Sequence, residues 1–163
     1  MIAPYLTRDY HVIAPDLPGF GQNERNPELA YDIAAQTARL NKFADTLGLQ
    51  SPHVAGNSMG GWIALRYALD YPDALASLTL LNNAGVNGAN ESDLQKQAAN
   101  EDYNPLVLAS LEDADRLVAM VVHKPPYLPK RLKPVFYADA LKYRDQLDAI
   151  FWIIANEGRD HPL

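Results

Sequence analysis

The chain lacks several features that mark large classes of proteins. None of its 163 residues is cysteine, so the sequence offers neither disulfides nor thiolate metal sites. No apolar run approaches the roughly 20 residues needed to span a bilayer, and residues 1–5 do not resemble the start of a signal peptide. The formal net charge of −6 disfavours a nucleic-acid partner. No metal-ligand spacing occurs, so we expect no metal or cofactor; the compartment is left open.

The most informative motif lies in residues 54–65, where a short apolar run is followed by glycines, one serine and an apolar helix. This is G-x-S-x-G between a strand and a helix, which predicts a nucleophile elbow around Ser58. We expect a strained serine backbone and no room for side chains two residues before and after it. A glycine-rich turn with a purely structural role is the alternative. The elbow residues are Gly56, Asn57, Ser58, Met59, Gly60 and Gly61.

The first half of the chain alternates between strand and helix patterns. Strands are predicted over residues 10–15, 52–56 and 75–82, and helices over 31–48 and 59–71. This order predicts parallel strands joined by crossover helices, an α/β sheet. The loop with Gly19-x-Gly21 does not fit a dinucleotide motif, because a third glycine and a following helix are missing.

The second half of the chain shows no convincing strand between residues 91 and 157. Ser110-x-x-Asp113 predicts a capping box that opens a helix. A proline-rich break at residues 125–129 precedes another helix, and a last one is expected from about Tyr143 to Asn156, ending at Gly158. Residues 86–163 therefore read as a helical segment with an aromatic and aliphatic inner surface.

Together, residues 12–21, 53–62 and 78–85 resemble the middle of an α/β-hydrolase. The resemblance is to the monoacylglycerol-lipase-like and bacterial lipase/esterase branch. It implies a partial α/β-hydrolase core with about three parallel strands in residues 1–85, and a helical cap, or lid, in residues 86–163. The three strands would correspond to the fourth, fifth and sixth of the family.

The resemblance implies that Ser58 attacks an ester carbonyl and that the backbone N–H of Met59 forms part of the oxyanion hole. The acid and the histidine of the triad follow later strands in this family, so neither is expected in this chain. The histidines at 11, 53, 123 and 161 are poor candidates, with His161 the least constrained. The sequence therefore reads as an internal fragment, inactive or nearly so alone, whose exposed sheet edges favour self-association.

The expected substrate is a small-molecule ester or lipid. An aliphatic and aromatic pocket wall over Ser58 suits acyl chains, although cap packing explains each of its residues equally well. Two alternatives remain: a non-catalytic α/β module that binds a ligand or partner, and another serine α/β-hydrolase chemistry, such as C–C hydrolysis or a haloperoxidase-like reaction. The candidate pocket residues are Met120, Val121, Val122, Tyr127, Phe136, Tyr137, Phe151 and Trp152.

Overall fold

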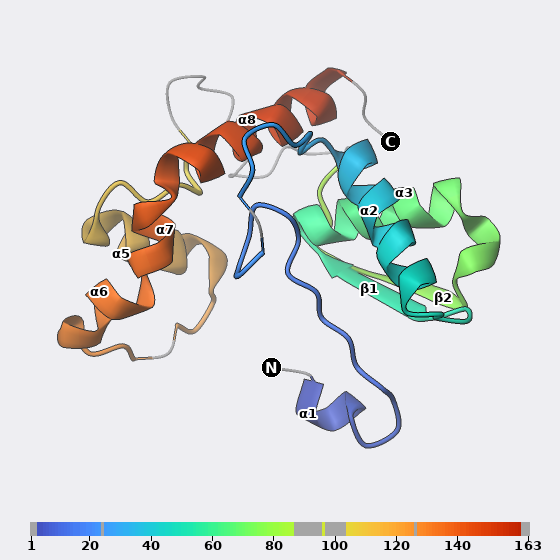
Figure 1. The fold of residues 1–163 in the computed structure, drawn as a ribbon. Coiled ribbons are helices and arrows are strands. Elements are labelled where there is room, and N and C mark those ends of the chain that lie inside the picture. Colours follow the sequence, from blue (N-terminus) through green and yellow to red (C-terminus); the bar gives the residue numbers. More distant parts are fainter. Residues whose placement is uncertain (1–2, 24, 87–95, 97–103, 126, 161–163) are drawn as a thin grey trace.

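The computed structural model describes residues 3–23, 25–86, 96, 104–125 and 127–160 (Figure 1). A small sheet with its helices forms one side of the molecule, and the helices of the second half form the other (Figure 1). The elements are α1 (Ala3–Leu6), α2 (Ile33–Thr46), β1 (His53–Asn57), α3 (Met59–Asp70), the 3₁₀ helix η1 (Pro72–Ala74), β2 (Ser77–Leu81), α5 (Leu111–Val121), the 3₁₀ helix η2 (Lys130–Leu132), α6 (Lys133–Phe136), α7 (Ala138–Lys142) and α8 (Arg144–Asp160).

The sheet consists of β1 and β2, which pair in parallel from His53 opposite Ser77 to Asn57 opposite Leu81. Helix α3 connects the two strands and contacts both. Alternate strand residues are half-buried and exposed, so one face of the sheet is covered and the other faces solvent. The predicted parallel α/β arrangement is confirmed for these elements.

The strand predicted over residues 10–15 is wrong: this segment is irregular and runs from α1 toward α2 without joining the sheet (Figure 1). A strand needs a partner for its backbone N–H and C=O groups. In the described part of the chain, the sheet holds only β1 and β2. The apolar pattern of residues 10–15 is therefore not sufficient by itself to form a strand. Self-association through open sheet edges stays a prediction.

The core lies between α2 and α3, where Ile33, Trp62 and Ile63 form a buried cluster. Helix α2 begins at the N-cap Asp32, whose side chain accepts a hydrogen bond from the Ala35 N–H at 2.8 Å. The predicted burial of α3 holds for its inner face, whereas Leu69 on the outer face is 59% exposed. Burial of these apolar side chains makes the main favourable contribution to the packing of the two helices.

Helix α8, predicted as part of the cap, packs directly against the core. Ile154 contacts the core cluster, and Ile150 is buried beside Gly19. The Glu157 carboxylate accepts a hydrogen bond of 2.7 Å from the Ile33 N–H, in the first turn of α2. Gly158 does not end α8, which continues to Asp160; a glycine within a helix costs only about 1 kcal/mol. The boundary between residues 85 and 86 stays a prediction.

The capping box predicted at the start of α5 is confirmed. Ser110 Oγ accepts from the Asp113 N–H, and Asp113 accepts from the Ser110 N–H. Burial raises the pKa of the Asp113 carboxyl, but hydrogen bonds from Ala109 and Ser110 and the charge of Arg116 outweigh it and hold that pKa below its usual range. The predicted helix after the proline break is present as η2, α6 and α7.

No described helix combines the length and the apolar character that crossing a membrane requires.

The turn between β1 and α3 depends on two crowded glycines: Gly56, as predicted, and Gly61, where Gly60 was expected. A Cβ on Gly56 would lie 2.1 Å from the carbonyl oxygen of Gly60, and a Cβ on Gly61 would lie 2.5 Å from the Cβ of Asn83. The expectation for Gly60 is wrong, because a Cβ there has no neighbour within 4 Å. The turn at Ser58 brings β1 against the backbone of α3. Gly56 and Gly61 are therefore the elbow positions where a Cβ has no room.

These contacts predict opposite effects of the same substitution at Gly56 and Gly60. Gly56→Ala should lower the free energy of unfolding of the intact protein by about 1–3 kcal/mol, because backbone must shift. Gly60→Ala should leave it unchanged or raise it by about 0.4–1 kcal/mol. Urea unfolding of both variants measures the difference. Equal destabilisation by the two variants would contradict the described turn.

The capping box predicts a local effect on α5. Ser110→Ala should destabilise the helix by about 1 kcal/mol, whereas Ser110→Asp, which keeps an N-cap acceptor, should cost only a few tenths. Amide hydrogen exchange in α5 is the measurement, since it reports local opening of one helix. Exchange that is unchanged in Ser110→Ala would rule out a stabilising cap.

Candidate active site

Ser58 stands between the end of β1 and the first turn of α3, with backbone angles φ 52° and ψ −124°. A non-glycine residue rarely adopts this conformation, which costs on the order of 1–3 kcal/mol. The residue is exposed, and its side chain makes no capping bond to α3. The backbone conformation therefore holds a serine hydroxyl in solvent at the tip of a strand.

Three backbone N–H groups hold the Ser58 turn in place through its carbonyl oxygen. Gly61 and Trp62 donate to it from α3 at 2.9 and 3.1 Å, and Ala84 donates from the segment after β2 at 3.0 Å. On the other side, the N–H of Ser58 donates to the Leu81 carbonyl at 3.2 Å. The strained turn is thus fixed by both α3 and the end of β2.

The segment after β2 supports the elbow in a way that sequence reasoning missed. The side-chain amide of Asn57 donates to the Leu81 carbonyl at 3.0 Å, and Asn82 has a positive φ of 44°. At Gly85, with φ 81°, a Cβ would lie 2.3 Å from the Trp62 ring. The run Asn-Asn-Ala-Gly after an apolar strand was the available signal, because such residues favour turns.

The Met59 N–H lies at the first position of α3, where backbone N–H groups have no partner within the helix. Within the described residues, no hydrogen bond occupies it. The Met59 side chain packs instead against the core cluster. A free N–H at a helix N-terminus, next to the serine, is suited to stabilise negative charge on a reacting oxygen.

The described histidines lie on β1 and in two irregular segments. His53 is at the opposite end of β1, roughly 16 Å from Ser58 along an extended strand, and its Nδ1 lies 2.8 Å from Ser77 Oγ. His11 and His123 are exposed in irregular segments. His161, the least constrained candidate, lies outside the described residues. Among the described residues, no histidine is hydrogen-bonded to Ser58.

The candidate pocket residues divide into two groups. Tyr127 is 89% exposed and Phe136 is 72% exposed, so both side chains lie in solvent in this structure. Met120, Phe151 and Trp152 are half-buried, and the last two stack edge to face. Of the remaining three, Val121 is exposed, and Val122 and Tyr137 are half-buried. An acyl pocket over Ser58 stays a prediction.

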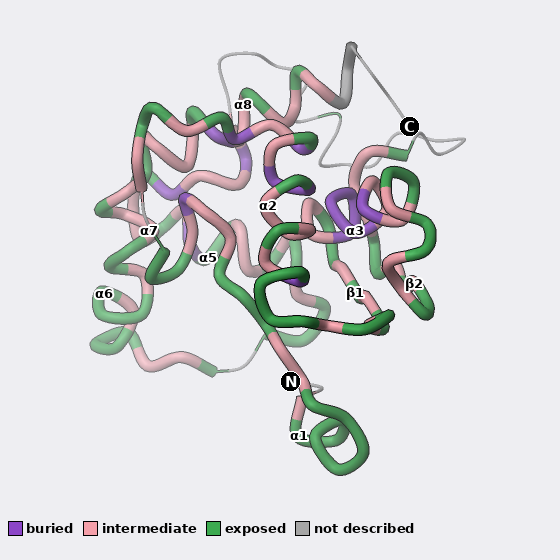
Figure 2. Tube along the Cα trace, turned by 45° about the vertical axis from the view of Figure 1, so that its right-hand side comes forward, coloured by how far each residue is buried: buried purple, intermediate pink, exposed green. Residues whose placement is uncertain are grey.

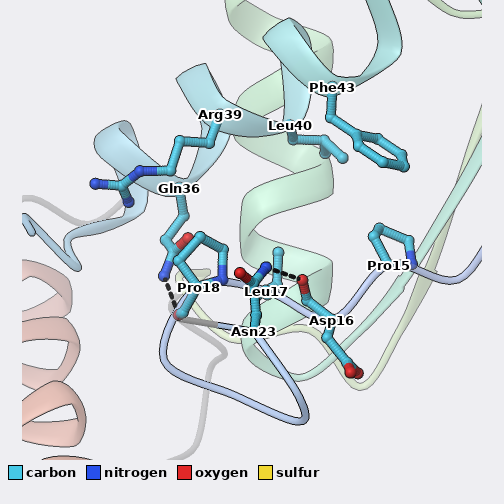
Figure 3. A pocket seen from close by; sticks show the side chains of 9 residues that line it. All are labelled: Pro15, Asp16, Leu17, Pro18, Asn23, Gln36, Arg39, Leu40 and Phe43. Atoms are coloured by element: carbon cyan, nitrogen blue, oxygen red, sulfur yellow. Dashed lines mark hydrogen bonds between the residues drawn. The ribbon is translucent and has the colours of Figure 1, made fainter. Parts of the chain in front are cut away.

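A separate pocket of about 130 Å³ lies between α2 and the loop that contains Gly19 (Figure 3). Gln36 donates to the Pro18 carbonyl at 3.3 Å, and Asn23 donates to the Asp16 carbonyl at 2.9 Å (Figure 3). Small-molecule sites usually occupy about 300–1,000 Å³. A pocket of this size does not accommodate a long acyl chain. Its lining residues are Pro15, Asp16, Leu17, Pro18, Asn23, Gln36, Arg39, Leu40 and Phe43.

At Gly21, the loop folds back against Asp16. Gly21 has φ 55°, and a Cβ there would lie 2.2 Å from the Asp16 carboxylate. That carboxylate accepts a hydrogen bond of 3.0 Å from the Gln22 N–H. No helix follows the loop directly, since α2 begins at Ile33, in agreement with the prediction that this is not a dinucleotide motif.

Comparison with known proteins identifies the family. Residues 2–137 match the family described as the alpha/beta hydrolase fold. Lipase 1 of Psychrobacter immobilis is 42% identical over 141 residues, which are 86% of this chain and 44% of that protein. Monoacylglycerol lipase abhd6-A of Xenopus laevis is 27% identical over 99% of this chain and 50% of that protein.

A solved structure agrees with these relatives. A membrane phospholipase A, described as a novel bacterial virulence factor, superposes with a TM-score of 0.88 and 39% identity, covering 93% of this chain and 49% of that one. The chain thus spans about half the length of the proteins it resembles. The chain belongs to the alpha/beta-hydrolase family, in its lipase-like branch.

Proposed function

We propose that the intact protein is a serine hydrolase of carboxylic esters, with Ser58 as its nucleophile and the Met59 N–H as one oxyanion donor. The single observation that carries the proposal is the strained, exposed Ser58 between β1 and α3. This backbone conformation keeps the Ser58 hydroxyl away from α3. A nucleophilic serine needs such exposure, because its oxygen must reach the carbonyl carbon of the substrate.

Two further observations support an ester as the substrate. The elbow carries a serine, the residue that forms an acyl intermediate with an ester. The relatives that match most of this chain include proteins named as a lipase and a monoacylglycerol lipase. We therefore infer that the acyl group comes from a lipid or another small-molecule ester.

We infer that the general base and the acid come from residues outside the described part of the chain, because no described histidine is hydrogen-bonded to Ser58. A serine hydroxyl is a weak nucleophile without a base within hydrogen-bond reach. The described histidines lie in loops or at the far end of β1. Residues 1–163 alone should consequently show little or no hydrolysis, while the intact protein should be active.

Labelling with a fluorophosphonate probe tests the nucleophile. The intact protein should be labelled rapidly and stoichiometrically, since the probe reacts with an activated serine, and Ser58→Ala should abolish labelling. The matched control is Ser77→Ala, which removes an exposed serine hydroxyl at the opposite end of the sheet and should label normally. Mass spectrometry of the digested protein locates the modified residue.

The outcomes also separate the alternatives. Labelling that survives in Ser58→Ala would refute Ser58 as the nucleophile. An intact protein that is not labelled would favour the non-catalytic binding module. Labelling of Ser58 without turnover of any ester in a panel of acyl chain lengths would favour another serine hydrolase chemistry. Rapid labelling of residues 1–163 alone would contradict the assignment of the base.

A further inference from the structure

The segment after β2 is fastened to both backbone groups of Ser58. The Ser58 N–H donates to the Leu81 carbonyl at 3.2 Å, and the Ala84 N–H donates to the Ser58 carbonyl at 3.0 Å. Asn82 and Asn83 lie between these two hydrogen bonds. The strands pair in parallel up to the residues just before Ser58 and Asn82, and paired strands lie about 4.8 Å apart. Asn82 is therefore held beside Ser58 at the same edge of the sheet.

The two asparagines after β2 differ in what their side chains do. Asn83 is half-buried, and its amide donates to the Ala84 carbonyl at 3.2 Å. Its Cβ is also the atom that a Cβ on Gly61 would approach to 2.5 Å. Asn82 is exposed, and its side chain forms no hydrogen bond with any described residue. The Asn82 amide is therefore available to another molecule.

The backbone of Asn82 is strained. Its φ of 44° lies in the left-handed region, which glycine adopts without a steric cost. The chain uses a glycine for such a turn at Gly85, where φ is 81°. Strained non-glycine residues occur preferentially at active sites. Asparagine tolerates this region better than most residues do, so a role in the turn alone is the alternative that an experiment has to exclude.

Ser58 has a polar neighbour on each of two elements. The Met59 N–H stands at the start of α3, and the Asn82 amide follows the end of β2. Figure 2 shows the buried residues of α3 beside β1 and β2, whose residues are half-buried or exposed. The carboxyl ends of parallel strands are where α/β sheets bind ligands. A substrate that reaches Ser58 at this edge therefore comes close to both groups.

The chemistry of an ester decides which part of it the Asn82 amide can bind. Under the proposed function, on which this inference rests, the Met59 N–H faces the carbonyl oxygen. An acyl chain is apolar and leaves a polar amide unpaired. An amide has both a donor and an acceptor, as a hydroxyl does. The alcohol part of the ester, where it carries a hydroxyl, is therefore the matching group.

We propose that the side-chain amide of Asn82 hydrogen-bonds the alcohol part of the ester bound at Ser58, and that it selects esters whose alcohol carries a further hydroxyl over simple alkyl esters. The alcohol leaves when the acyl group is transferred to Ser58. Its contact with Asn82 therefore acts on the acylation step. Hydrolysis of the acyl intermediate, which no longer holds the alcohol, does not depend on Asn82.

Two butyrate esters of equal size test the proposal on the intact protein: hydroxyethyl butyrate and propyl butyrate. The intact protein should prefer the hydroxyethyl ester. Asn82→Gly removes the amide and relieves the backbone strain, and it should lower kcat/KM for the hydroxyethyl ester by roughly 3- to 10-fold, which corresponds to the loss of one hydrogen bond. It should leave kcat/KM for the propyl ester and the rate of hydrolysis of the acyl intermediate unchanged. Asn82→Asp keeps an acceptor oxygen and should retain part of the preference.

Ser51→Gly is the matched control, because Ser51 is exposed, has φ 45° and precedes β1 at the opposite end of the sheet. It should leave kcat/KM for both esters unchanged. Fluorophosphonate labelling of Ser58 is measured in each variant. If Ser58 is labelled but Asn82→Gly lowers kcat/KM for the two esters equally, or for neither, the inference is overturned and the proposed function stands. If the intact protein is neither labelled nor active on either ester, the proposed function fails, and the inference fails with it.

Discussion

The turn at Ser58 is the constraint on which the rest of this structure depends. Its positive φ reverses the chain so sharply that Gly56 touches the backbone of α3. The strain is tolerated because the carbonyl oxygen of Ser58 accepts hydrogen bonds from α3 and from the segment after β2. β1, α3 and β2 therefore meet at this residue, and it is the proposed nucleophile.

The polar contacts of α8 show how the second half of the chain is joined to the first. Glu157 accepts from the first turn of α2, and Gln146 donates to the Tyr31 hydroxyl at 3.4 Å. The guanidinium of Arg25 also lies 3.9 Å from the centre of the ring of Tyr143, the residue just before α8.

The proposed chemistry is divided between local and distant parts of the protein. The nucleophile and the Met59 N–H need only a strand, a turn and a helix that follow one another in the chain. A general base has to be brought to Ser58 by another part of the fold. The relatives are about twice as long as the matched region.

The sequence by itself determined the features that depend on neighbouring residues: the serine elbow, the capping box at Ser110, the approximate extents of α2 and α3, and the family. Only the tertiary structure decided which elbow glycines are crowded, that residues 10–15 are not a strand, and that α8 packs on the core. A strand requires a partner from elsewhere in the chain, and a glycine is required only where another segment approaches it. The contact that crowds Gly61 comes from Asn83, after β2, and the partner of a strand likewise comes from another segment, so local patterns do not encode either feature.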